Sequence, residues 1–165
     1  MNMVKALFDI AGIHSERLRL EWISASEGTK FAEVVTEYTE NIKKIGHFDP
    51  YVFNFQLEAM KRTLKQEKIR WLVGIQRDLT KKENAYGEKI DPERYSQILH
   101  DVLKDEYLKS LIYLTIREKP MSVREIDKKS GIGVENISSY LTELEATGEV
   151  SLHGYVGRIS KYISK

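Results

Sequence analysis

The sequence predicts a mainly α-helical protein with a small β component, and three observations carry that prediction. Apolar residues recur at spacings of three and four along most of the 165 residues, which is the period of an amphipathic helix. Alternation of apolar and polar residues, the period of a strand, is confined to residues 17–23 and to two short runs near the C-terminus. All three prolines stand where one predicted element ends and the next begins.

Composition excludes several classes of function. The 26 basic and 25 acidic residues leave a net charge of +1, which disfavours a strongly cationic nucleic-acid-binding protein. The sequence has no cysteine, so it holds no disulfide, thiolate metal site, cysteine nucleophile or cysteine-ligated iron–sulfur cluster. No apolar run approaches the roughly 18 residues of a membrane span, and the first residues lack the pattern of a signal peptide. We therefore expect a cytoplasmic protein that does not enter the membrane.

Residues 1–46 predict a helix–strand–helix segment. A first helix over residues 3–11 is expected to end at Gly12, and a second, amphipathic helix is expected to end at Gly46. Between them, residues 17–23 alternate as a half-buried strand does. The apolar face of that strand consists of Leu18, Leu20 and Trp22.

The predicted strand at residues 17–23 needs a neighbour, because its backbone donors and acceptors cannot be satisfied by a single strand. It would pair with a second copy of the chain, with a partner protein, or with another part of a larger α/β domain. We therefore count Leu18, Leu20 and Trp22 as candidate interface residues.

Residues 47–104 predict a helical linker. Apolar spacing indicates one long amphipathic helix from Tyr51 to about Lys82, with Gly74 as a candidate break and Trp71 as a further candidate interface residue. After a loop, Asp91 and Pro92 form a typical helix start. The uncovered faces of the long helix and of the strand predict a homodimer in isolation.

Residues 105–165 predict three helices followed by two strands. Ser122 is expected to cap the second helix, residues 130–133 form a tight turn, and the third helix spans residues 134–146. The two strands are expected to be joined at Gly154 and Tyr155. The order Ser-Val-Arg-Glu-Ile at 122–126, Ser-Tyr-Leu-Thr-Glu-Leu-Glu at 139–145 and Thr-Gly-Glu-Val at 147–150 resembles the winged-helix family.

DNA-binding members of the winged-helix family read the major groove with the third helix. In this sequence the exposed side of residues 134–146 carries Glu135, Glu143 and Glu145 and no lysine or arginine, which disfavours contact with phosphates. We therefore favour protein docking over DNA binding, with a solvated surface as the simplest alternative. The candidate contacts with a partner or with DNA are Arg124, Lys128, Lys129, Asn136, Ser138, Ser139, Arg158 and Lys161.

No catalytic, cofactor-binding or metal-ligating residue is predicted. The four histidines are scattered and do not pair with carboxylates at metal-like spacing. Neither a glycine-rich dinucleotide motif nor a phosphate loop occurs.

Residues 15–35 read Ser-Glu-Arg-Leu-Arg-Leu-Glu-Trp-Ile-Ser-Ala-Ser-Glu-Gly-Thr-Lys-Phe-Ala-Glu-Val-Val. This stretch resembles the delta subunit of methyl-viologen-reducing hydrogenase, the iron–sulfur subunit that links a hydrogenase to heterodisulfide reductase. Residues 70–74 and 85–90 are also similar to the extension of longer bacterial and archaeal members, which can end in a winged helix.

The resemblance implies the C-terminal portion of that family without its cysteine-containing half. Family members hold a [2Fe–2S] cluster through cysteines that precede the matching segment, and no position of this sequence corresponds to them. The implied protein is a truncated or separately encoded half, or a descendant without redox chemistry.

The function that follows is a non-catalytic accessory or docking module of a hydrogenase/heterodisulfide reductase type electron-transfer complex. The alternative is a winged-helix transcription regulator whose N-terminal part forms a dimer.

Overall fold

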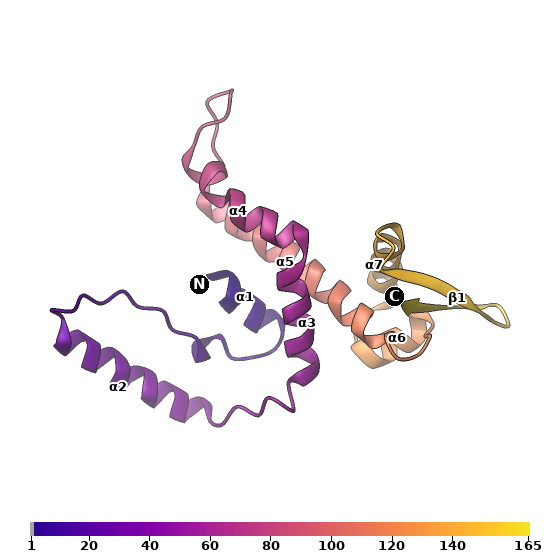
Figure 1. Cartoon of the computed structure of the whole chain (residues 1–165), viewed down its shortest axis with the longest axis horizontal. Coiled ribbons are helices and arrows are strands. Elements are labelled where there is room, and N and C mark those ends of the chain that lie inside the picture. The colour runs from indigo at the N-terminus through magenta and orange to yellow at the C-terminus, as the bar shows by residue number, and fades with distance from the viewer. Residues whose placement is uncertain (1) are drawn as a thin grey trace. The chain divides into compact units, whose positions relative to one another are not determined.

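The structure, a computed structural model, describes residues 2–165 and forms two compact units, one up to Phe53 and one from Asn54 to Lys165. Over the described residues it contains seven α-helices, one 3₁₀ turn and two strands (Figure 1). The prediction of a mainly α-helical protein with a small β component is therefore confirmed. Met1, with which the predicted segment 1–46 begins, lies outside the described residues.

The N-terminal unit contains α1 (Asn2–Ile10), the 3₁₀ turn η1 (Ser15–Arg17) and α2 (Gly28–Ile45). Gly12 follows α1 with a φ of 71°, and Gly46 ends α2 with a φ of 84°. Both angles lie in the region that only glycine enters without a steric penalty. Both predicted helix ends are confirmed.

The strand predicted over residues 17–23 is not formed. The backbone is extended at Leu18, with φ −116° and ψ 123°, yet no strand lies in the described part of the N-terminal unit. Side chains hold this segment instead, because the hydroxyl of Tyr38 on α2 donates to the carbonyl oxygen of Arg17, and Arg19 pairs with Glu37 on α2 at 2.8 Å. An alternating sequence indicates only which side chains would share a face of a strand. The backbone hydrogen bonds of a sheet cannot form without a second strand.

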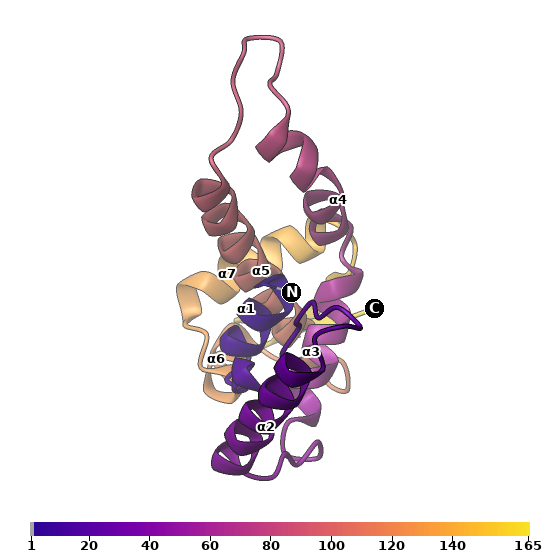
Figure 2. The same ribbon diagram turned by 90° about the vertical axis from the view of Figure 1, so that its left-hand side faces the viewer.

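The C-terminal unit begins with α3 (Asn54–Lys65) and α4 (Glu67–Lys81), where the sequence predicts one long helix. The break falls at Gln66, whose backbone is extended (φ −62°, ψ 135°), while Gly74 lies inside α4. A loop over residues 82–91 leads to α5 (Pro92–Thr115), which lies beside α4 in Figure 2.

The helix α5 crosses the position, between residues 104 and 105, where the sequence predicts a change from linker to C-terminal domain. Its start is as predicted, because Asp91 Oδ2 accepts hydrogen bonds from the backbone N–H groups of Glu93 at 3.0 Å and Arg94 at 3.1 Å. Near its N-terminus the Tyr95 hydroxyl donates to the Leu72 carbonyl oxygen of α4 at 2.8 Å. One continuous helix thus packs on α3 and α4 and also begins the C-terminal three-helix arrangement.

The remaining elements are α6 (Val123–Ser130), α7 (Val134–Ala146) and the antiparallel strands β1 (Val150–Val156) and β2 (Ile159–Ser164). Ser122 caps α6 as predicted, in a reciprocal capping box with Glu125. The hairpin turn lies at Gly157 and Arg158, three residues after the predicted position, and the strand pairing is irregular between Leu152 and Gly154.

A buried core joins α5, α6, α7 and the ribbon. Ile126 of α6 and Ile137, Leu141 and Leu144 of α7 are all at most 4% exposed. The core is completed by Ile112, Ile116, Met121 and Val150. Because this core fixes the inward face of α6, it leaves the basic side of that helix exposed.

Within the described residues, no helix is both long and apolar enough to cross a membrane.

Candidate functional site

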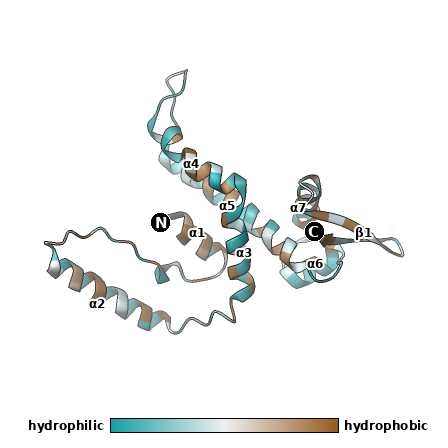
Figure 3. Cartoon of the chain, viewed as in Figure 1, coloured by the Kyte–Doolittle hydropathy of each residue, from teal (hydrophilic) through white to brown (hydrophobic). Residues whose placement is uncertain are grey.

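Large apolar side chains of the segment 1–46 are exposed, and we call four of them together the N-terminal apolar face. Its members are Leu20 (54% exposed), Trp22 (85%), Phe31 (59%) and Val35 (44%). None of the 18 residues of α2 is buried, although apolar residues recur along the helix (Figure 3). Aromatic side chains carry the largest apolar area of any residue and are usually covered, so this face has the composition of an interface.

Polar contacts hold the segment that carries Leu20 and Trp22 against α2. Arg19 binds Glu21 at 3.1 Å and Glu37 at 2.8 Å, and the hydrogen bond to Glu37 is the main reason why the pKa of Arg19 is raised. The intervening Leu20 and Trp22 make no comparable contact and stay exposed. The charged residue Arg19 therefore anchors this segment to α2.

The predicted interface residues fall into two groups. Leu18, Leu20 and Trp22 share one extended segment and line a hollow of about 490 Å³ in the N-terminal unit, with Leu18 half-buried. Trp71 is 60% exposed on α4 and belongs to the C-terminal unit. The structure therefore brings the first three together and places Trp71 in a different cleft.

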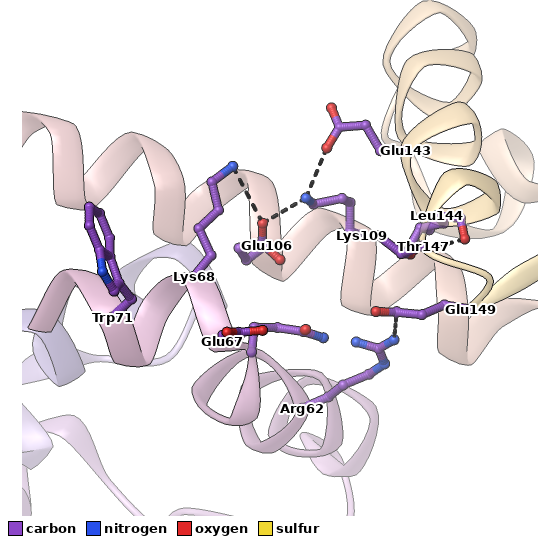
Figure 4. Close-up of a pocket in the computed structure, with 11 residues that line it drawn as sticks. Arg62, Glu67, Lys68, Trp71, Glu106, Lys109, Glu143, Leu144, Thr147 and Glu149 are labelled. Atoms are coloured by element: carbon purple, nitrogen blue, oxygen red, sulfur yellow. Dashed lines mark hydrogen bonds and ion pairs between the residues drawn. The ribbon is translucent and has the colours of Figure 1, made fainter. Parts of the chain in front are cut away.

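That second cleft has a volume of about 610 Å³ and lies within the C-terminal unit (Figure 4). The helices α3 and α4 contribute Arg62, Lys68 and Trp71, α5 contributes Glu106 and Lys109, and α7 with the following turn contributes Glu143 and Glu149. Basic and acidic side chains alternate around its wall.

The charges of this cleft are paired with one another. Lys109 Nζ lies 2.6 Å from Glu106 Oε1 and 3.0 Å from Glu143 Oε2, and the Lys109 and Glu106 side chains are 11% and 8% exposed. Burial disfavours the charged form of Lys109, but the hydrogen bonds to both glutamates outweigh it, so the pKa of Lys109 is raised. The network connects α5 to α7 and pairs the two buried charged residues of the cleft, Glu106 and Lys109.

A second ion pair lines the same cleft. Arg62 of α3 binds Glu149, which precedes β1, and its guanidinium lies 3.9 Å from the centroid of the Tyr113 ring. Sequence reasoning missed this pair and the Glu106–Lys109–Glu143 network. The sequence shows that Glu106 and Lys109 are three residues apart, a spacing that allows an ion pair on a helix. It does not show their partners on other elements, which are 34 or more residues away in the chain.

The predicted contact residues of the C-terminal part differ in how accessible their polar groups are. Arg124, Lys128 and Lys129 are exposed on α6, and Arg158 is exposed in the hairpin turn. Lys161 is half-buried and pairs with Glu125 at 2.5 Å, so its ammonium group is already bound.

The predicted contact residues of α7 are exposed, and two of them donate to backbone carbonyl groups four residues earlier in the chain. Asn136 Nδ2 donates to the Ile132 carbonyl oxygen at 3.2 Å, and Ser138 Oγ donates to the Val134 carbonyl oxygen at 2.9 Å. Ser139 is exposed beside them. Of the predicted set, the basic residues of α6 are therefore the most available for contact.

The described residues contain no group of three or more histidine, cysteine, aspartate or glutamate side chains placed to hold a metal ion. The sequence has no cysteine, so its residues do not fit a thiolate-ligated iron–sulfur cluster.

Comparison with known proteins gives one family model in the N-terminal segment and relatives that match the chain over a similar length. Residues 1–46 match the family model of the methyl-viologen-reducing hydrogenase delta subunit. The chain is 65% identical over 47 residues to an iron-sulfur subunit of the F420-non-reducing hydrogenase of Archaeoglobus profundus, an alignment covering 28% of this chain and 34% of that protein. It is 37% identical over 46 residues to a subunit of the ferredoxin:CoB-CoM heterodisulfide reductase of Methanosarcina mazei, covering 28% of this chain and 6% of that protein.

No solved structure matches the chain. The alignments span about a third of the first relative, 34%, and a small part of the second, 6%. The family likeness therefore lies in residues 1–46, the same part of the chain that carries the N-terminal apolar face.

Proposed function

We propose that this chain is a non-catalytic accessory module that docks on a redox complex of the hydrogenase or heterodisulfide reductase type. The observation that carries the proposal is the position of the N-terminal apolar face within residues 1–46, the segment that matches the family model. The chain is also similar, over 47 and 46 residues, to a hydrogenase subunit and to a heterodisulfide reductase subunit. Similarity to subunits of two kinds of redox complex favours a role in assembly with such a complex.

Trp22 is the expected anchor of the docking surface. Its side chain is 85% exposed, so nearly all of its apolar area is available to a partner. Interface tryptophans often cost about 2 kcal/mol or more of binding free energy when truncated, which is roughly a thirtyfold loss of affinity.

The test compares Trp22→Ala with a matched control, Tyr86→Ala, whose ring is 87% exposed on the loop of the C-terminal unit. The immobilised chain is exposed to native extract, and the retained proteins are identified by mass spectrometry. We expect hydrogenase or heterodisulfide reductase subunits on the wild-type and Tyr86→Ala chains, and at least about a tenfold loss on Trp22→Ala. Absence of those subunits from the wild-type chain, or equal retention by Trp22→Ala, would contradict the proposal.

We further propose that α5, α6, α7 and the β1–β2 ribbon form a winged helix. Support comes from the order of these elements and from their shared core. It also comes from an isolated antiparallel bridge between Met121 and Tyr162, which joins the segment before α6 to the ribbon. In this reading the module serves protein docking.

The alternative, a DNA-binding regulator, is favoured by the exposed basic residues of α6 and by Arg158 in the hairpin turn. The exposed acids Glu135 and Glu145 on α7 oppose it, because they would repel phosphates in a major-groove complex, whereas the predicted acid Glu143 is paired with Lys109 of α5.

Fluorescence anisotropy against a randomised duplex pool and the upstream region of the gene, at two salt concentrations, separates the two functions. We expect no binding beyond the non-specific range of roughly 10⁻⁴ to 10⁻⁶ M. Sequence-selective binding tighter than about 10⁻⁷ M would make the regulator the better interpretation.

A further inference from the structure

We propose that a hollow beside α6 binds an acidic segment of a partner protein. The hollow, which we call the α6 lysine pocket, has a volume of about 420 Å³. It is lined by Lys119, Pro120, Met121, Glu125, Lys128 and Lys129. The inference rests on the protein-docking role proposed for the C-terminal module, and it uses none of the residues of the N-terminal unit.

The pocket is positively charged because its one acid is already bound. Glu125 Oε2 accepts hydrogen bonds from Ser122 N at 2.6 Å, from Ser122 Oγ at 2.7 Å and from Lys161 Nζ at 2.5 Å. The helical spacing of four residues would allow Glu125 to pair with Lys129, but no such pair is formed. No ion pair found among the described residues includes Lys119, Lys128 or Lys129.

Other nearby acids do not neutralise the lysines either. Asp127 Oδ1 accepts a hydrogen bond from Gly133 N at 3.0 Å, so it is used in the turn after α6. Glu118 is exposed next to Lys119 in the sequence, and it does not line the pocket.

The stability of α6 does not explain where all these positive charges lie. Lys128 and Lys129 occupy the last turn, where the helix dipole favours cations. Arg124, in contrast, lies in the first turn, where the dipole disfavours a cation. Arg124 and Lys128 are also four residues apart, which places two like charges on one side of the helix. Positive charge is therefore concentrated here at some cost to the helix, as a binding surface requires.

The pocket's floor and size favour a peptide over a nucleic acid. Met121, which is 4% exposed, and Pro120, which is half-buried, line the pocket together with the lysines, and we call these two residues its floor. An extended peptide can place an apolar side chain on that floor and carboxylates against the lysines. A duplex would instead extend along the surface, where the exposed Glu135 and Glu145 of α7 repel phosphates.

The test uses the full chain and three short fluorescein-labelled probes, followed by anisotropy. The probes are a peptide of alternating glutamate and leucine, the same peptide with lysine in place of glutamate, and a DNA duplex. The variant is Lys128→Glu/Lys129→Glu. The matched control is Lys43→Glu/Lys44→Glu, which reverses two adjacent, exposed lysines in the last turn of α2.

We expect the acidic peptide to bind, with an affinity that falls as salt is raised. The Lys128/Lys129 reversal should weaken it at least about fivefold, because two exposed charge pairs are lost and replaced by repulsion. The Lys43/Lys44 reversal should change it less than about twofold, and the lysine peptide should not bind. Thermal unfolding of both variants checks that they remain folded.

Three outcomes would overturn the inference: no binding of the acidic peptide, equal loss in both double variants, or tighter binding of the duplex than of the peptide. Trp22→Ala should leave peptide binding unchanged, so failure of the N-terminal docking proposal and failure of this one are distinguishable.

Discussion

Replacing Lys109 with methionine tests whether the buried network fixes α7 on α5. The substitution keeps most of the apolar stem and removes the ammonium group that lies 2.6 Å from Glu106 and 3.0 Å from Glu143. Glu106, 8% exposed, then keeps a negative charge without its principal partner. Breaking a buried pair in this way costs about 3–5 kcal/mol.

We expect Lys109→Met to lower the free energy of unfolding by about 3 kcal/mol, near the lower end of this range, because Lys68 can still compensate the charge of Glu106. Lys68 Nζ lies 3.8 Å from Glu106 Oε1 and can approach it further, since its side chain is 57% exposed. The matched control is therefore Lys68→Met, an identical substitution of the exposed lysine that lies farther from the same glutamate, for which we expect a loss of stability below about 1 kcal/mol.

Urea denaturation followed by tryptophan fluorescence, in a Trp22→Phe background, measures the loss of stability of the C-terminal unit. The chain has two tryptophans, so the background leaves Trp71, which lines the same cleft, as the only one. The Lys109→Met change should lower the midpoint of thermal unfolding by roughly 10 °C. In a double-mutant cycle, Glu106→Gln/Lys109→Met should be less destabilised than the sum of the single variants by about 1–3 kcal/mol.

The pH dependence gives a second readout. The pKa of Lys109 is raised in the folded chain, so its stabilising contribution is fully present below the ordinary lysine pKa of about 10.4 and is lost as pH rises through the raised value. The difference between wild type and Lys109→Met should thus stay constant from neutral pH to about pH 10. The structural role of the network would be refuted if Lys109→Met lowered the free energy of unfolding by less than about 1 kcal/mol. It would also be refuted if the effects of Glu106→Gln and Lys109→Met were strictly additive in the double-mutant cycle.

Three further predictions concern Glu125, Asp91 and the N-terminal apolar face. The hydrogen bonds that Glu125 accepts, first from Lys161 and then from Ser122, lower its pKa to about 2. Its contribution to stability is therefore present above the ordinary carboxyl pKa and is lost as pH falls toward 2. Acid titration followed by circular dichroism should show that this loss is absent in Glu125→Gln. Asp91→Ala removes the two bonds that cap α5 and should destabilise the C-terminal unit by about 1 kcal/mol, measured by urea denaturation, and an unchanged midpoint would contradict the capping role. The uncovered N-terminal apolar face predicts a homodimer in isolation, so light scattering at micromolar concentration should give about twice the chain mass of 19.2 kDa, and a clean monomer mass would exclude it.

The candidate sites were only partly predictable. Leu20 and Trp22 were found from alternation alone, and the structure leaves both exposed. Phe31 and Val35 were indicated only as part of an apolar stripe, because a sequence does not reveal whether a neighbour covers the stripe. For α6, spacing identified Arg124, Lys128 and Lys129, but the commitment of Glu125 to Lys161, 36 residues away, became visible only in the folded chain.

Local chemistry determined where most elements begin and end. Asp91 with Pro92, Ser122 with Glu125, and the glycines after α1 and α2 act over one helical turn, so their effects are visible in a few neighbouring residues.

Only the tertiary structure decided the features that depend on distant partners. Residues 17–23 have the pattern of a strand, but the described part of the N-terminal unit supplies no second strand to complete the hydrogen bonds. The central helix breaks at Gln66, where α3 and α4 both pack on α5, and not at Gly74. Lys109 is buried because Glu143 reaches it from α7, a contact between residues 34 apart in the chain. Burial of a charge depends on which elements meet, and local spacing does not specify that.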